Sequence, residues 1–184
     1  GRIAVPIYDN KHRVAVGFTA RSIFEKCDKC QRWHDPDQSC PVTSLEINKT
    51  SKWHNNFRKE HYLYNFWYAA EHILRTRTIV LCEGPGDIWR LEEAGVHIGL
   101  AMLGSKLSDQ QQVIIEKSGA SNIVVLTDSD QAGDEARKQV RERLGNLCKL
   151  HFPVLQTKDV GEMAIEAVAA SLNPLLEKIF QRGY

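Results

Sequence analysis

The sequence predicts an α/β protein in which a parallel four-stranded sheet with helices on both faces follows a small α+β lobe. From residue 78 on, short β-branched and aliphatic runs alternate with stretches of helical periodicity, which is typical of parallel sheets covered by helices. Alternating apolar residues at the start of the chain predict a β-hairpin in the lobe. We therefore expect a basic N-terminal subdomain over residues 1–77 and the sheet domain, with a C-terminal helix, over residues 78–184.

The hairpin is predicted from two runs of alternating apolar residues, 2–8 and 14–18, separated by the turn-like Asp9-Asn10-Lys11. Pro6 has no backbone N–H, so it places the first strand at an edge or a bulge. Arg21 follows the hairpin, where its side chain could meet an anion or lie in solvent.

A basic and aromatic segment spans residues 45–68. Cations interleaved with rings are typical of surfaces that follow a nucleic-acid backbone and stack on bases. The segment from Tyr64 to Leu74 also has the periodicity of an amphipathic helix, so most of its rings are expected in the core. Lys52, Asn55 and Arg58 are the better candidates for contact with a nucleotide.

The sheet domain is predicted to contain four strands and five helices. The last helix has Pro174 in its first turn, where the missing N–H is tolerated. The expected strands lie near 78–83, 97–103, 122–127 and 147–153, and the expected helices near 87–94, 108–118, 132–144, 161–170 and 173–181.

Composition and charge narrow the class of protein. The 184 residues have the composition of a soluble globular protein, with no bilayer-spanning run and no signal peptide, so a cytoplasmic location without membrane contact is expected. A strand at the very start suggests a fragment of a longer chain. Residues 1–82 carry a net charge of +5 and residues 83–184 carry −4. Such asymmetry suits a protein that handles phosphate chains, although unevenly charged surfaces without this role also occur.

Three of the five cysteines lie close together with a histidine, in the spacing C-x2-C-x3-H-x5-C. Cys27, Cys30, His34 and Cys40 would supply the four ligands of a structural Zn²⁺ site. The alternative is a loop with reduced, unliganded thiols. His54 is a reserve ligand if His34 points away.

Acidic residues follow two of the predicted strands. Glu83 ends the run at 79–82, and Asp128 and Asp130 end the run at 123–126. Parallel strands end at one edge of a sheet, so these carboxylates should meet there, and an all-oxygen set suits Mg²⁺ or Mn²⁺. The alternative is that the acids cap the following helices, which would fit one strand-end acid better than three.

Two further acids could reach the same edge. Asp87 lies in the first turn of the helix after Glu83, and Asp159 lies in the sequence 158–162 near the end of the fourth predicted strand. A capping role is the alternative for both residues. For Asp87 we consider capping and metal contact equally consistent with the sequence.

These motifs resemble the Toprim domain of primases, topoisomerases, RecR-type recombination proteins and some nucleases. The resemblance covers residues 78–170 and rests on Glu83-Gly84 and on the Asp-x-Asp-x-Ala-Gly motif at 128–133. The hairpin with Arg21, and Lys52-Trp-His-Asn55, are similar to the segments preceding Toprim in DnaG-type primases. The sequence 158–162 is closer to that of phage primase-helicases.

The resemblance implies a DNA primase, a DNA-directed RNA polymerase that transfers nucleotides to make RNA primers. It implies that Glu83, Asp128 and Asp130 are catalytic metal ligands, with Asp87 and Asp159 as secondary acids of one Mg²⁺ or Mn²⁺ site. Arg21, Lys52 and Asn55 would bind nucleotide or template. The implied partners are single-stranded DNA, ribonucleoside triphosphates and, through domains outside this chain, a replicative helicase.

Two departures from the primase pattern accompany the resemblance. The loop at 27–40 replaces a short, metal-free connection of bacterial primases. We expect any zinc bound there to stabilise this loop locally and not to form the separate zinc-binding domain. A primase's separate zinc-binding domain, helical subdomain and helicase-contacting tail do not occur in these residues, which puts the activity of the fragment alone in question. A RecR-like DNA-binding module and a metal-dependent Toprim nuclease are the alternative functions. A topoisomerase is disfavoured, because no segment resembles its tyrosine-bearing domain.

Overall fold

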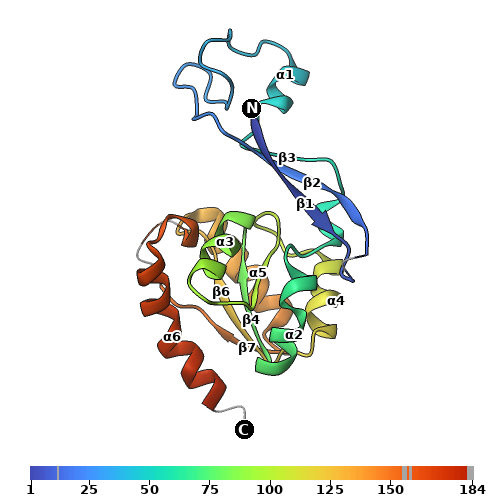
Figure 1. Ribbon diagram of the computed structural model, residues 1–184, viewed down its shortest axis with the longest axis vertical. Helices are drawn as coiled ribbons and strands as arrows, with labels where there is room; N and C mark the ends of the chain where they lie inside the picture. The colour runs from blue at the N-terminus through green and yellow to red at the C-terminus, as the bar shows by residue number, and fades with distance from the viewer. Residues whose placement is uncertain (12, 155–156, 158, 182–184) are drawn as a thin grey trace. The chain divides into compact units, whose positions relative to one another are not determined.

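The computed structural model describes residues 1–11, 13–154, 157 and 159–181. The chain divides into two compact units, Gly1–Arg58 and Lys59–Tyr184. Figure 1 labels their helices and strands.

The first unit is built on a three-stranded antiparallel sheet in the order β1-β2-β3. Strands β1 (Arg2–Tyr8) and β2 (Ala15–Ser22) form the predicted hairpin, and Pro6 lies on the edge strand β1. A long connection that carries helix α1 (Ser44–Lys49) leads from β2 to the short strand β3 (Trp53–Asn55) (Figure 1).

The second unit contains the predicted parallel sheet, in the order β5-β4-β6-β7. All five residues of β4 are buried, which explains why its sequence is a continuous apolar run rather than an alternating one. The strands are shorter than predicted, especially β5 and β7. They are β4 (Thr78–Cys82), β5 (Gly99–Ala101), β6 (Asn122–Leu126) and β7 (Lys149–His151).

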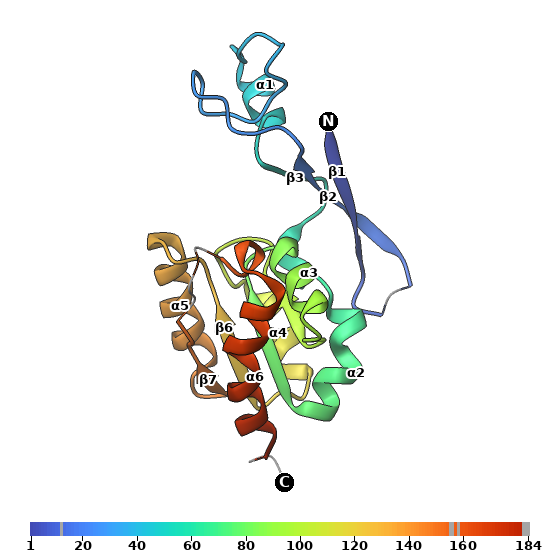
Figure 2. The same cartoon turned by 60° about the vertical axis from the view of Figure 1, so that its left-hand side comes forward.

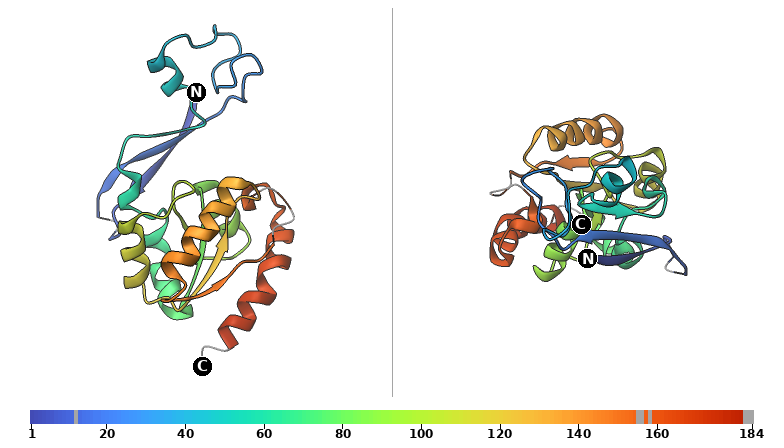
Figure 3. Two further views of the ribbon diagram at one scale, coloured as in Figure 1. Left: turned by 180° about the vertical axis from the view of Figure 1, so that it is seen from behind. Right: turned by 90° about the horizontal axis from the view of Figure 1, so that it is seen from above.

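Helices cover both faces of this sheet, as predicted. Helices α3 and α6 lie on one face and α4 and α5 on the other (Figures 2 and 3). Short 3-10 turns η1 (Lys59–His61) and η2 (Val160–Glu162) complete the unit. The four covering helices are α3 (Pro85–Glu93), α4 (Asp109–Lys117), α5 (Gln131–Leu144) and α6 (Ile165–Gln181).

The boundary between the units comes earlier than the predicted one at residues 77/78. Helix α2 (Phe66–Thr76), which the prediction assigned to the lobe, packs against β4 and β5. Its Ala69 and Ile73 are completely buried in the core of the second unit. The buried Gln111 amide also donates hydrogen bonds to the carbonyls of Tyr62 (2.9 Å) and Met102 (2.8 Å), which ties the segment before α2 to the sheet.

The C-terminal helices differ from the prediction. Residues 161–170 and 173–181 were expected to form two helices, but a turn of η2 is followed by the single helix α6 with Pro174 inside it. Proline removes one backbone hydrogen bond. The helix continues because a stripe of buried side chains on both sides of the proline, including Val168, Leu172 and Leu176, packs against the core. No helix in the described part of the chain is both long and apolar enough to cross a bilayer.

Candidate metal centres

Glu83 and the 128–130 loop meet at the carboxyl edge of the parallel sheet. Cys82 of β4 is paired with Leu126 of β6, so the chain leaves both strands side by side. The Glu83 carboxylate accepts a hydrogen bond from the backbone N–H of Asp128, with a distance of 3.1 Å between Oε1 and N. The Glu83 carboxylate thus lies against the backbone of the 128–130 loop, near enough for the charges of Asp128 and Asp130 to act on it.

The start of α5 determines the shape of the 128–130 loop. Asp130 is the N-cap residue, and its Oδ1 accepts a hydrogen bond from Gly133 N at 3.0 Å. The Thr127 hydroxyl donates to the Gly133 carbonyl at 3.1 Å. Gly133 lies so close to the loop that a Cβ atom added to it would be 1.9 Å from the Asp128 carbonyl oxygen. Only glycine fits this position without displacing the backbone of the loop.

Asp87 joins two segments that are far apart in the sequence. Its Oδ2 accepts a hydrogen bond from Gly84 N at 3.0 Å, and its Oδ1 accepts one from Gly161 N at 3.2 Å. Asp159 caps the η2 turn, because its Oδ1 accepts from Glu162 N at 2.9 Å. Both residues therefore make the capping contacts of the alternative interpretation, and these contacts also hold the two acids at one edge. Lys158 lies outside the described residues.

The acids perturb one another. Burial, followed by the charge of Asp128, raises the pKa of Glu83 to about 7, although the N–H of Asp128 opposes this. Burial also raises the pKa of Asp87 to about 6, against the hydrogen bond from Gly84 and with a contribution from the charge of Asp159. Burial is the main cause of both shifts, and the neighbouring negative charges add to it; a divalent cation would offset that second contribution.

The chemistry of these side chains fits a hard divalent cation, because the donors are carboxylate oxygens. Their spacing is looser than that of a closed metal site. Within the described ranges, the one group of three or more acidic, cysteine or histidine side chains that is close enough to hold an ion is the cysteine–histidine cluster. Carboxylates without a cation repel one another, and a bound cation would offset that repulsion.

The predicted zinc ligands form a compact cluster in the first unit. The ligand atoms of Cys27, Cys30, His34 and Cys40 all lie within 4.8 Å of one another. Hydrogen bonds from the backbone N–H groups of Cys30 and Lys29 lower the pKa of the Cys27 thiol to about 6. The arrangement is consistent with a zinc site. The reserve ligand His54 lies on β3 and is not part of the cluster.

Comparisons with known proteins identify the second unit. Residues 77–151 match the Toprim domain family. The chain is similar to the DNA primase of Campylobacter jejuni, with 26% identity over 184 residues, or 99% of this chain and 27% of that protein. The Aquifex aeolicus primase (zinc-binding and RNA polymerase domains) has a TM-score of 0.73 and 26% identity, covering 96% of this chain and 40% of that one. The chain contains a Toprim domain of the DnaG-primase type.

A third relative supports the fold of this Toprim domain and of the first unit. The DnaG primase catalytic domain bound to single-stranded DNA has a TM-score of 0.66 and 21% identity, covering 94% of this chain and 51% of that one. The chain spans little more than a quarter of the Campylobacter jejuni primase.

The predicted nucleotide-binding residues all lie in the first unit. Arg21 on β2 pairs with Trp53 on β3, and its guanidinium carbon lies 5.8 Å from the centre of the tryptophan ring. Asn55, two residues further along β3, extends from the same face of the sheet. Its Oδ1 is buried without a hydrogen-bond partner. Lys52 and Arg58 are exposed on either side of β3.

Sequence reasoning missed two residues that support the acids of the Toprim domain. Thr127 is completely buried directly after β6 and fixes the turn through Gly133. Arg137 donates from its guanidinium to the carbonyl of Thr127 at 3.2 Å and forms a 2.8 Å ion pair with Asp134. Arg137 lies about two helical turns after Asp130, so this spacing is the signal that could have indicated it.

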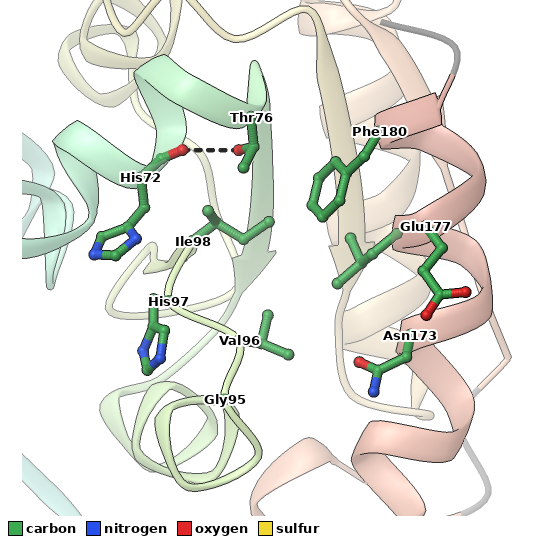
Figure 4. A pocket seen from close by; sticks show the side chains of 10 residues that line it. His72, Thr76, Gly95, Val96, His97, Ile98, Asn173, Glu177 and Phe180 are labelled. Carbon is green, nitrogen blue, oxygen red and sulfur yellow. Dashed lines mark hydrogen bonds between the residues drawn. The ribbon is translucent and has the colours of Figure 1, made fainter.

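A separate cavity of about 240 Å³ lies at the opposite end of the Toprim domain. It is bounded by α2, the segment 95–98 and α6, and none of the five acids lines it (Figure 4). In its wall, Thr76 lies two residues before β4 and Ile98 directly before β5, so the cavity is at the amino edge of the sheet. It is therefore distinct from the carboxylate cluster.

Proposed function

We propose that this chain is part of the polymerising core of a DNA primase, which synthesises RNA primers on single-stranded DNA. The proposal is supported chiefly by the meeting of Glu83 with the 128–130 loop at the carboxyl edge of the sheet. The similarity to primases over nearly the whole chain supports it independently.

In this proposal Glu83, Asp128 and Asp130 hold Mg²⁺ or Mn²⁺, and Asp87 and Asp159 are secondary acids of the same site. Bound divalent ions would lower the pKa of the attacking 3′-hydroxyl and neutralise charge on the triphosphate. The role of the chain is to position the donors. The hydrogen bonds from Asp128 N to Glu83 and from Gly133 N to Asp130 each orient one oxygen of a carboxylate.

The first unit would bind the nucleotide or the template. Arg21 and Asn55 share one face of the β-sheet. The guanidinium of Arg21 would contact a phosphate, and the unpaired amide oxygen of Asn55 would accept a hydrogen bond from the adjoining sugar or base. Lys52 and Arg58 would add charge for the nucleic-acid backbone. The template is single-stranded DNA, and the substrates are ribonucleoside triphosphates.

The proposal also includes features beyond this chain. A replicative helicase would associate through other parts of the whole protein. The location would be the cytoplasm of a bacterium or of a phage-infected cell.

The test is ribonucleotide incorporation on single-stranded DNA with Mg²⁺ or Mn²⁺, using the whole primase that contains this chain. Glu83→Gln and Asp128→Asn should each lower the rate at least about 100-fold, since both remove a charge from the metal-binding edge. Glu142→Gln is the matched control, because Glu142 is exposed on α5 and makes only a 4.0 Å pair with Lys138. Unchanged incorporation by the first two variants would contradict the proposal, and DNA cleavage in place of synthesis would indicate a nuclease.

A further inference from the structure

The connection between β2 and β3 has no hydrophobic core. It spans residues 23–52, and among its residues with described side chains none of the hydrophobic ones is buried. Ile23, Val42 and Leu45 are more than half exposed, at 58%, 85% and 73%. The buried side chain is instead polar, that of His34. A segment of this size without an apolar core usually requires a metal or a disulfide to fold.

Two pairs of the ligand atoms have nearly the spacing of a tetrahedral metal site. The Sγ atoms of Cys27 and Cys40 are 4.0 Å apart, and Cys30 Sγ is 3.2 Å from His34 Nε2. Tetrahedral Zn²⁺ with its usual bond lengths places two sulfurs about 3.8 Å apart, and a sulfur and a nitrogen about 3.5 Å apart. These two spacings differ from the ideal values by a few tenths of an ångström, and all four ligand atoms lie within 4.8 Å of one another, so an ion could be accommodated with adjustments of up to about 1 Å.

Backbone groups orient the ligands before any ion binds. The Nδ1 atom of His34 lies 2.8 Å from the carbonyl of Asp35, which directs Nε2 toward the sulfurs. The backbone N–H groups of Lys29 and Cys30 donate to the sulfur of Cys27. A disulfide would not use this geometry, because it would join two of the sulfurs and leave the histidine without a function.

Hydrogen bonds tie the segment that leads into β3 to the cluster and to the end of β2. The N–H of Trp33, next to His34, donates to the carbonyl of Thr50 at 2.9 Å. The N–H of Ser22 donates to the carbonyl of Lys52 at 2.9 Å. Strand β3 has only three residues, and its pairing with β2 must overcome the entropy of closing the long connection. A bound ion would divide that connection into shorter loops.

We propose that Cys27, Cys30, His34 and Cys40 bind one Zn²⁺ in a closed structural site, and that this ion folds the connection and holds β3 on the sheet. This proposal does not rest on the proposed polymerase activity, because the four ligands include none of the acids at the edge of the Toprim domain.

The first experiment measures metal content. The chain purified under reducing conditions should contain one zinc per molecule. Cys30→Ser and His34→Ala should lose it, while His34→Cys should retain it, since four thiolates also suit tetrahedral zinc. Cys148→Ser is the matched control, because its thiol lies half-buried in the second unit beside the carbonyl of Ala120. Co²⁺ in place of zinc should give the visible absorption of a tetrahedral thiolate site in the wild type and not in Cys30→Ser.

The second experiment tests the role of the ion in folding. Removing zinc with a chelator should accelerate amide hydrogen exchange in residues 27–40 and 53–55 by at least about tenfold, and adding zinc should reverse the change. The amides of β4 should keep their protection, which serves as the internal control. Metal-free wild-type protein, a Cys27–Cys40 disulfide in its place, or unchanged exchange in β3 after zinc removal would each overturn the proposal.

Discussion

Replacing Gly133 with alanine should damage the acidic edge of the Toprim domain without altering its charges. A methyl group on Gly133 would lie 1.9 Å from the carbonyl oxygen of Asp128, whereas real Cβ atoms essentially never approach within 3.0 Å. The loop would therefore have to move by about 1 Å to relieve the overlap. That shift would carry the N–H of Asp128 away from the Glu83 carboxylate, which it contacts at 3.1 Å.

Two opposing effects set the magnitude of the stability change. Alanine favours a helix over glycine by about 1 kcal/mol, so helix propensity alone predicts that Gly133→Ala is stabilising. Overpacking a buried contact costs about 1–3 kcal/mol, and an overlap of this size belongs at the upper end. We expect the free energy of unfolding to fall by about 1–2 kcal/mol. Since a 1 Å misplacement can cost about 100-fold in rate, nucleotide incorporation should fall by that order.

The assay is urea denaturation without metal, followed by calorimetric titration with Mn²⁺. Ala132→Gly is the matched control, because it changes the same methyl group at the neighbouring exposed position. It should lower stability by up to about 1 kcal/mol and leave the Mn²⁺ affinity unchanged. If the Gly133→Ala protein is as stable as the wild type and binds Mn²⁺ as tightly, the steric reasoning is refuted.

Three further predictions concern stability. The pKa of Glu83 is about 7 in the folded state rather than 4.5, so between these values the metal-free folded state holds a proton that the unfolded state releases. The melting temperature should therefore fall as the pH rises from 5 to 7.5. The fall should be less steep in Glu83→Gln, which cannot bind this proton. Asp87→Ala should lower the free energy of unfolding, measured by urea denaturation, by about 1–3 kcal/mol, because it leaves the N–H groups of Gly84 and Gly161 without their acceptor. Asp87→Asn should lower it less, since the amide oxygen can still accept one of the two hydrogen bonds. Pro174→Ala should raise the free energy of unfolding by roughly 1 kcal/mol or more, because it restores a helical hydrogen bond at an exposed position; no change would show that α6 has already adapted to the proline.

The sequence was sufficient to predict the parallel sheet and to place Glu83 and the 128–130 loop after two of its strands. The uninterrupted apolar runs of β4 and β6 are buried as expected, and parallel strands necessarily end at one edge. The shared direction of parallel strands predicted that Glu83 and the 128–130 loop lie at one edge, while the pairing of β4 with β6 that makes them neighbours comes from the structure. The cysteine–histidine spacing was equally informative, because its four ligands lie within one short loop.

Features that depend on tertiary contacts were not predictable in this way. The boundary between the units was misplaced because α2 belongs to the core that it packs against, and local periodicity does not specify which core that is. The continuity of α6 through Pro174 likewise depends on burial that outweighs a local helix-breaking signal. The bond from Gly161 to Asp87 joins residues 74 positions apart, a contact that no local pattern specifies.

Four of the five acids at the edge of the sheet also accept hydrogen bonds from backbone N–H groups; they are Glu83, Asp87, Asp130 and Asp159. An alanine scan of this edge would consequently confuse two defects, the loss of negative charge and the release of a loop. Amide substitutions that keep an oxygen in place separate the two. Phenotypes of truncated acids here should be interpreted as an upper limit on what their charge contributes.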